Sequence, residues 1–246
     1  MKMSSPHKAN RLYGRSRGRP LGTHQHYLMD HLYPNISLDP DNLSVIDVAI
    51  DSEIERGGAS QSEQEIWFEI GFGGSEHLIW QAQQNPKVTL WGAEPFVNGL
   101  AKALTAIERE DLDNIRLYLG DGRDILTSLS SESLARVFVL FPDPWSKARH
   151  HKRRLIDPEF IEHVWRVLKP GGHFRFASDI IHYVDWSLTR IKAHGGFEFT
   201  PKVQKDWRQR PDDWPSTRYL EKALREGRAG HFFEFTKIMP QTTDKP

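Results

Sequence analysis

Short apolar runs alternate with amphipathic stretches along the chain, and this alternation predicts strands that are each followed by a helix. The predicted strands are residues 67–70, 88–93, 115–119, 137–141 and 173–177, and the predicted helices are residues 76–84, 97–108, 124–129, 158–168 and 183–193. Residues 197–199 and 231–238 are two further predicted strands, expected to form a hairpin or an antiparallel edge. The repeated βα units predict an α/β fold with a doubly wound, mostly parallel sheet and an antiparallel C-terminal edge.

The expected domain organisation is a flexible basic segment, residues 1–25, followed by one domain, residues 26–246. Glycine and proline interrupt any periodicity in the first segment, where six cations precede the first acid, Asp30. A chain of 246 residues and 28.5 kDa can bury one large core. The basic segment is interpreted either as a solvated tail or as a segment that orders on a nucleic acid.

Composition excludes several classes of chemistry. The chain has no cysteine, so disulfides, thiolate nucleophiles, cysteine-ligated zinc and iron–sulfur clusters are ruled out. It has no apolar run long enough for a membrane span and no signal-peptide core, so we expect a cytoplasmic protein without a membrane segment.

Charge is informative through its distribution. The net charge is zero, with 33 basic and 33 acidic residues, but the segment Lys147–Arg154 contains five cations and two histidines without an acid. Together with the basic N-terminal segment, it suggests a polyanion that docks at particular places.

The glycine-rich turn Gly71–Gly74 lies between a predicted strand and a predicted helix, where ligands of α/β sheets bind. A dinucleotide fingerprint would need a third glycine at residue 76, which is Glu. A carboxylate there, with Glu69 ahead of the turn, disfavours a pyrophosphate. A turn that binds nothing is the structural alternative.

Two further acids follow predicted strands. Glu94 is placed to accept hydrogen bonds from a ribose diol, and Asp121 to meet an adenine amino group. Either one alone could be a solvated turn carboxylate, but acids at successive strand ends weaken that interpretation.

The segment Phe141–Arg154 carries the strongest signal. Asp143 lies between two prolines directly after a buried strand, so its backbone is stiff and the carboxylate is aimed. Trp145 either stacks on a base or packs. His150 and His151 lack carboxylates at metal-ligand spacing, so no metal site is expected.

On these residues the chain resembles class I S-adenosylmethionine-dependent methyltransferases with a Rossmann-like fold, and among them the tRNA (guanine-N7)-methyltransferases. The resemblance covers roughly residues 60–238, and its specific part runs from Pro142 to Leu155. It implies S-adenosylmethionine as cofactor, and a guanosine in the variable loop of tRNA, position 46, as the methylated nucleoside. The expected assembly is a monomer or a weak homodimer without metal.

The resemblance also implies roles for individual residues. Asp143 is the expected catalytic residue, and the expected cofactor contacts are Glu69, Gly71, Gly73, Glu94, Asp121 and Asp143. The expected substrate contacts are Lys147, Arg149, Lys152, Arg153, Arg154, Asp179, Thr217, Arg218, Tyr219 and Glu221. The C-terminal Thr-x-Tyr-Glu element is matched only in part, because Leu220 stands at the usual Glu position and Glu221 is displaced by one.

Two alternative functions remain. A nucleobase amino-methyltransferase also places an Asp/Asn-Pro-Pro-aromatic element after this strand, but here Pro142 lies on the wrong side of Asp143. A non-catalytic RNA-binding subunit would have no need for acids at three strand ends.

Overall fold

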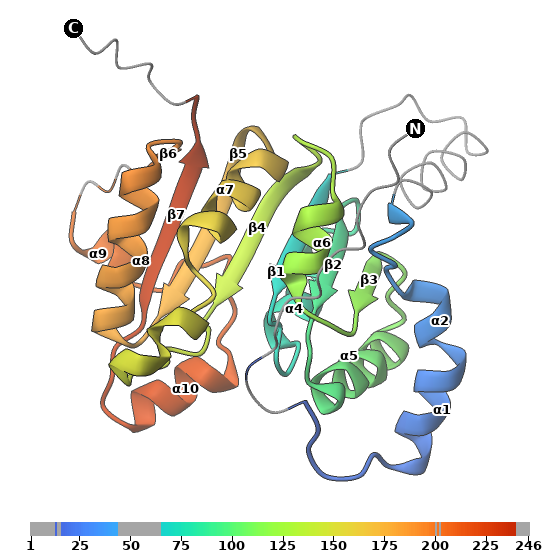
Figure 1. The fold of residues 1–246 in the computed structure, drawn as a ribbon. Coiled ribbons are helices and arrows are strands. Elements are labelled where there is room, and N and C mark those ends of the chain that lie inside the picture. Colours follow the sequence, from blue (N-terminus) through green and yellow to red (C-terminus); the bar gives the residue numbers. More distant parts are fainter. Residues whose placement is uncertain (1–12, 14–15, 44–64, 200, 202, 240–246) are drawn as a thin grey trace, which may run out of the picture.

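The computed structural model describes residue 13 and residues 16–43, 65–199, 201 and 203–239. The strands are β1 Ile66–Ile70, β2 Thr89–Ala93, β3 Ile115–Tyr118, β4 Leu134–Leu140, β5 Leu168–Ser178, β6 Phe197–Glu198 and β7 His231–Lys237. The α-helices are α1 Thr23–His31, α2 Tyr33–Ile36, α4 Glu76–Gln84, α5 Val97–Glu110, α6 Gly122–Ser128, α7 Pro158–Val167, α8 Ile181–His194, α9 Lys205–Arg208 and α10 Arg218–Arg225, and η1 Ala148–Arg153 is a 3-10 helix. The predicted alternation of strands and helices is confirmed (Figure 1).

The strands form one sheet in the order β3-β2-β1-β4-β5-β7-β6. The first five strands run parallel, whereas β7 pairs antiparallel with β5 and with β6. The predicted doubly wound sheet and its antiparallel C-terminal edge are therefore confirmed. The strand order reverses between β1 and β4, and this reversal opens a crevice at the carboxyl ends of the strands.

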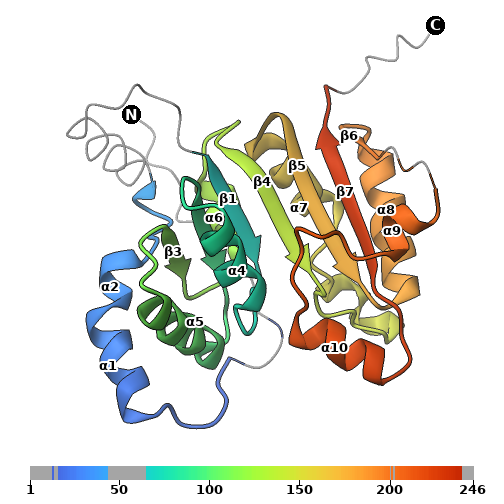
Figure 2. The same ribbon diagram turned by 180° about the vertical axis from the view of Figure 1, so that it is seen from behind.

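Helices cover both faces of the sheet (Figures 1 and 2), and an apolar layer lies between the helices and the sheet on each face. Leu78 of α4 and Leu100 and Leu104 of α5 are fully buried in one layer. Helices α6, α7 and α8 build the other, with Phe160 and Ile161 among its buried residues. Each strand of the parallel part is thus covered on both sides, which explains why its sequence is almost continuously apolar.

Helix α7 shows how local sequence determines an element. The Asp157 side chain accepts a hydrogen bond from the backbone N–H of Phe160 at 2.9 Å, and Pro158 occupies the first helical position. The helix ends at Val167, and the next residue, Leu168, already belongs to β5. The strand β5 consequently begins earlier than the predicted 173–177.

The C-terminal region differs from the simplest prediction. β6 and β7 are antiparallel neighbours, but the segment between them contains α9 and α10, so they form an antiparallel edge and not a hairpin. Neither of these helices was predicted. Both are short, and their apolar positions face packing partners that are distant in sequence.

The N-terminal helices α1 and α2 were also not predicted. Leu28 of α1 is buried against α5, which gives this helix its place in the core. Within the predicted flexible segment, Ser16 and Arg19 carbonyls accept hydrogen bonds from Val97 and Asn98 of α5. Residues 1–12, 14 and 15 lie outside the described residues, and the flexibility of residues 1–25 stays a prediction. Among the described residues, no helix combines the length and apolarity that crossing a bilayer requires.

Candidate functional site

A cavity of about 370 Å³ lies at the carboxyl ends of β1, β2 and β4. It brings together seven of the residues predicted from the sequence, namely Gly71, Gly73, Glu94, Asp121, Asp143, Arg153 and Tyr219. Apolar side chains complete its walls, among them Ile70, Phe96 and Leu140. Its volume falls within the range of small-molecule sites, and its mixture of apolar walls and a few polar groups is typical of them.

The glycine turn forms one wall of this cavity. Gly71 and Gly73 have φ values of +76° and +55°, in the left-handed region that glycine adopts without strain. A side chain at Gly73 would also collide with Tyr219, because an added Cβ would lie 2.7 Å from the ring. The glycine therefore permits helix α10 to approach the turn closely.

Glu94 holds this turn in place from the end of β2. Its carboxylate accepts hydrogen bonds from the backbone N–H groups of Gly73 at 2.7 Å and Phe96 at 3.0 Å. The side chain is buried, and desolvation raises its pKa above the ordinary value. Because each carboxylate oxygen has two lone pairs, both oxygens can still accept a hydrogen bond from a ligand.

Asp121 caps helix α6 at the opposite wall. It accepts a hydrogen bond from the backbone N–H of Arg123 at 3.0 Å, and the Arg123 guanidinium binds the same carboxylate, with Nη2 2.5 Å from Oδ2. Arg123 itself lines the cavity and was not singled out in the sequence. The Arg123 guanidinium neutralises the Asp121 carboxylate. Of the two acids that follow β2 and β3, Glu94 is therefore the one that lines the cavity without an ion pair to another described residue.

Glu69 does not line the cavity, although it was predicted as a cofactor contact. Successive residues of a strand point to opposite faces, and Ile70 is the residue of this pair that reaches the cavity. Glu69 is buried and lies 2.8 Å from Nδ1 of His77 on α4. Its role as a cofactor contact stays a prediction.

His77 continues a buried polar chain that starts at Glu69. Gln81 lies 3.2 Å from His77 Nε2 and donates to the backbone carbonyl of Asp213 at 2.7 Å. The Asp213 carboxylate in turn pairs with Arg175 of β5, 2.7 Å between Oδ2 and Nη1. The chain connects β1 to the segment that leads into α10, a connection that no local motif revealed.

Helix α10 then brings the C-terminal element over the cavity. Thr217 caps the helix, Arg218 pairs with Glu76 at 2.5 Å, and Tyr219 lines the cavity. Leu220 is buried with Trp214 and Phe232, whereas Glu221 is exposed and lies 3.5 Å from Ser216 Oγ. Leucine at position 220 thus serves the core of this chain.

The loop after β4 presents Asp143 to the cavity. Phe141 and Trp145, two residues on either side of Asp143, have positive φ values of +52° and +43°, which are rare for side chains of this kind. Asp143 keeps contact with solvent, but the groups around it partly desolvate its carboxylate and raise its pKa. Within the described part of the chain, no hydrogen bond or ion pair engages this carboxylate, so it is available to a ligand.

The predicted substrate cations divide into two groups. Lys147, Arg149 and Lys152 are exposed, while Arg153 lies over the rings of Tyr13 and Trp145, at 4.8 and 5.0 Å from their centroids. Tyr13 also lines the cavity, and nothing in its sequence neighbourhood indicated this position.

Arg154 belongs to neither the surface nor the cavity. It is 3% exposed, donates to the Pro144 carbonyl at 2.9 Å and lies 4.7 Å from the centroid of the Trp186 ring. It therefore fastens the loop that carries Asp143 to helix α8. Asp179, another predicted substrate contact, lies outside the cavity and pairs with Arg228 at 2.6 Å.

Comparison with known proteins places these residues in a family. The family model described as "Putative methyltransferase" matches residues 63–232. A tRNA (guanine-N(7)-)-methyltransferase of Ruegeria pomeroyi is 43% identical over 240 residues, which cover 97% of this chain and 99% of the relative. One of Ruegeria sp. (strain TM1040) is 42% identical over 229 residues, covering 92% and 87%. The chain belongs to the tRNA (guanine-N(7)-)-methyltransferase family.

Solved structures agree on the fold of this methyltransferase. One described as an antibiotic-related methyltransferase has a TM-score of 0.52 at 16% identity and covers 82% of this chain and 95% of its own. A 30S ribosomal A1408 methyltransferase from an uncultured bacterium has a TM-score of 0.51 at 14% identity, covering 82% and 95%. At these identities the likeness establishes the Rossmann-like methyltransferase fold alone.

The contrast between Arg154 and its exposed neighbour Lys152 gives a testable prediction for this methyltransferase. Arg154→Ala should lower the free energy of unfolding by about 2–3 kcal/mol, because it removes a desolvated cation–π contact and the hydrogen bond to Pro144. Lys152→Ala, the matched control, should change it by less than about 0.5 kcal/mol. Urea unfolding of both variants measures the difference, and equal stabilities would contradict a fastening role for Arg154.

Proposed function

We propose that this protein transfers the methyl group of S-adenosylmethionine to N7 of a guanosine in tRNA, with the variable-loop guanosine at position 46 as the target. Family membership supports the reaction, and the observation that carries the assignment of the reaction centre is the unpaired Asp143 carboxylate at the mouth of the cavity. The tRNA substrate is also the reason to expect this protein in the cytoplasm.

The residues of the cavity fit this cofactor. Its acids, Glu94 and Asp143, suit a ligand with a cationic sulfonium and amino group, and would repel the pyrophosphate of a dinucleotide. A third acid of the lining, Asp121, is neutralised by Arg123. When bound, S-adenosylmethionine supplies an electrophilic methyl group.

In the proposed arrangement Glu94 accepts hydrogen bonds from the ribose hydroxyls through the lone pairs that Gly73 and Phe96 leave free. The apolar walls between Ile70 and Leu140 hold the adenine ring, and Asp121 contacts the adenine amino group while Arg123 fixes its orientation. Tyr219 closes the cavity over the glycine turn. Its hydroxyl is a donor at neutral pH, and partial desolvation raises its pKa further above the ordinary value.

Alignment carries most of the proposed catalysis. Guanine N7 has an in-plane lone pair and no proton, so its attack on a methyl group requires no general base. Holding N7 in line with the methyl carbon can lower the barrier by several kcal/mol. The purine becomes cationic as the N–C bond forms, and Asp143 stabilises that charge by accepting hydrogen bonds from guanine N1–H and the exocyclic amine.

The exposed cations complete the proposal. Phosphates of the tRNA backbone are bound by Lys147, Arg149 and Lys152. These contacts position the target guanosine without reading the sequence of the tRNA. Asp179 is the second candidate for a contact with the base, although its ion pair with Arg228 already occupies one side of the carboxylate.

The function is tested by its product. Incubation of the protein with an unmodified tRNA transcript and methyl-labelled S-adenosylmethionine should place the label in 7-methylguanosine after digestion to nucleosides. A transcript with adenosine in place of the variable-loop guanosine should take up no label. Label in N6-methyladenosine would instead support an amino-methyltransferase, and an absence of cofactor binding would support a non-catalytic RNA-binding subunit.

Removal of Glu94 should weaken cofactor binding. Glu94→Ala deletes the carboxylate, and hydrogen bonds to a charged group contribute about 1.5–3 kcal/mol, so the dissociation constant should rise about 10- to 150-fold. Glu94→Gln keeps the shape and one acceptor and should give an intermediate loss. Isothermal titration measures both, and unchanged affinity in Glu94→Ala would contradict the assigned cofactor site.

Asp143→Asn should lower the turnover number about 10²–10³-fold while cofactor affinity is kept, since the shape remains and only the charge opposite the developing cation is lost. Turnover of the wild type should fall with acid as Asp143 is protonated, at a pH above that of an ordinary aspartate because partial desolvation raises its pKa. The variant should lack this acid limb.

Stability provides the control for that variant. A raised carboxylate pKa means that the folded protein binds this proton more readily than the unfolded chain, so the charge on Asp143 opposes folding as pH rises through the folded-state pKa. Asp143→Asn should therefore not unfold the protein at neutral pH. If Asp143→Asn had the turnover number of the wild type and kept the acid limb, Asp143 would be only a loop residue.

A further inference from the structure

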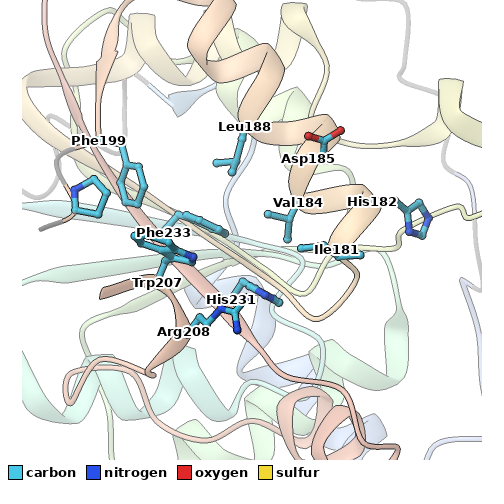
Figure 3. Close-up of a pocket in the computed structure, with 11 residues that line it drawn as sticks. Ile181, His182, Val184, Asp185, Leu188, Phe199, Trp207, Arg208, His231 and Phe233 are labelled. Carbon is cyan, nitrogen blue, oxygen red and sulfur yellow. The ribbon is translucent and has the colours of Figure 1, made fainter. Parts of the chain in front are cut away.

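A second cavity, about 610 Å³ in volume, lies on the other side of helix α8 from the methyl-transfer site, between α8, α9 and β7. Its walls are mainly apolar, and Figure 3 shows the rings of Phe199, Trp207 and Phe233 gathered on one side of it with Val184 and Leu188 on another. None of the residues predicted to bind cofactor or substrate lines this cavity.

One end of the cavity lies at the edge of the sheet where the parallel strands end, the edge that also carries Asp143. His231, one of its lining residues, is the first residue of β7 and pairs with Ser178, the last residue of β5. Ile181, another lining residue, begins α8 three residues after Ser178 and is 64% exposed. Exposed Ile181 therefore marks an end of the cavity two residues from Asp179, on the edge of the sheet where the proposed function brings the tRNA.

The lining of the cavity contains a cation that can bind a phosphate. Arg208 contributes a guanidinium to the lining and His182 an imidazole, and Lys205 and Asp206 are both exposed just before Arg208 on α9. Asp185 is the single acid among the lining residues. Aromatic walls with cations at the entrance are the arrangement by which proteins bind unpaired bases together with their phosphates.

Helix α8 connects this cavity to the basic segment after β4. Trp186 on α8 contacts both Arg154 and His151, with ring-to-cation and ring-to-ring distances of 4.7 and 5.3 Å. Val184 and Leu188, on the same helix, line the cavity. The basic segment after β4 and the cavity therefore contact the same helix, α8.

We propose that this cavity binds an unpaired base of the tRNA other than the guanine that is methylated. The base stacks on Trp207, whose ring is inclined by 67° to that of Phe199, so that Phe199 contacts the edge of the base, and Arg208 binds its phosphate. This inference rests on the proposed function, because it takes tRNA as the substrate. It gives the enzyme a second point of recognition that depends on the tertiary fold of the tRNA and not on the target guanosine alone.

Two other occupants fit less well. The C-terminal residues 240–246 offer two prolines as their apolar side chains, and β7 carries the chain from His231 at one end of the cavity to Lys237 at the opposite edge of the sheet. A second copy of this chain that docked through the same face would bring Arg208 and Lys205 of the two copies together. The lining offers one acid, Asp185, to pair with them.

The first experiment closes the entrance of the cavity in the full-length protein. Ile181→Trp adds a large ring at an exposed position, and Ile181→Ala, the matched control, leaves the cavity open. Since one stacked base contributes about 1–3 kcal/mol, Ile181→Trp should weaken binding of an unmodified tRNA transcript between about 5- and 150-fold, with cofactor affinity and melting temperature unchanged. Ile181→Ala should bind within about twofold of the wild type.

A second variant covers the case in which the ring at position 181 disturbs α8. Trp207→Leu keeps an apolar side chain but removes the stacking surface, and should show the same loss. Tyr27→Leu removes a ring on α1 that is 53% exposed, more than the half-buried Trp207, and is the control for a general loss of aromatic surface.

The base itself is identified by ultraviolet crosslinking of 4-thiouridine-substituted tRNA, with the crosslinked peptide expected to contain Phe199 or Trp207. A tRNA that lacks the base at the crosslinked nucleotide should bind the wild type as weakly as intact tRNA binds Ile181→Trp. Binding of this abasic tRNA to Ile181→Trp should be no weaker still. Such non-additivity would tie the effect to one base in one cavity.

The outcomes separate this inference from the proposed function. If the wild type methylates tRNA at guanine N7 but Ile181→Trp and Trp207→Leu both bind tRNA normally, the cavity is not a base site and the function stands. If Ile181→Trp leaves tRNA binding unchanged but alters the sedimentation coefficient, this face makes contacts between copies of the chain. The cavity is then not a base site, and the function again stands. If the wild type transfers no methyl group to tRNA, both proposals fail.

Discussion

The parallel pairing of β1 with both β2 and β4 determines where the functional groups of this protein lie. The chain leaves β1 toward β2 and β3 on one side and returns to β4 and β5 on the other, so the loops after β1 and β4 diverge and leave a crevice between them. The glycine turn, Glu94 and Asp143 all follow strands that end at this crevice. The strand order alone therefore places a crevice at this point, whichever side chains line it.

A second constraint closes the crevice from outside the parallel sheet. Arg175 of β5 pairs with Asp213, and Gln81 of α4 donates to the carbonyl of the same residue, so the segment before α10 is held to both the sheet and α4. This anchor is largely buried on the Arg175 side, where an unpaired charge would be costly. Fixing residue 213 fixes α10 and brings Tyr219 over Gly73, which connects the antiparallel C-terminal edge to a site built by the parallel strands.

Local patterns predicted what local physics determines. The cap of Asp157, the apolar runs of the strands and the glycine turn all depend on residues close in sequence, and the structure confirms these elements. Arg154 could not be separated from Lys152 in the same way, because its burial depends on Trp186 and Tyr183, about thirty positions further along the chain. The contact between Glu69 and His77 was not predicted for a related reason, since the packing of α4 brings His77 to Glu69.

The strain around Asp143 shows how these constraints act together. Left-handed backbone at Phe141 and Trp145 costs each residue roughly 1–2 kcal/mol, and glycine would relieve the cost at either position. Aromatic residues nevertheless stand at both positions, and both rings line the cavity. Phe141 packs on Phe232, and Trp145 packs on Tyr13. The hydrogen bond from Phe141 N–H to the Ala177 carbonyl and that from Arg154 to the Pro144 carbonyl hold the loop at both ends. A loop strained and tied in this way presents one carboxylate in one direction, and alignment is what transfer of a methyl group to a nitrogen without a proton requires.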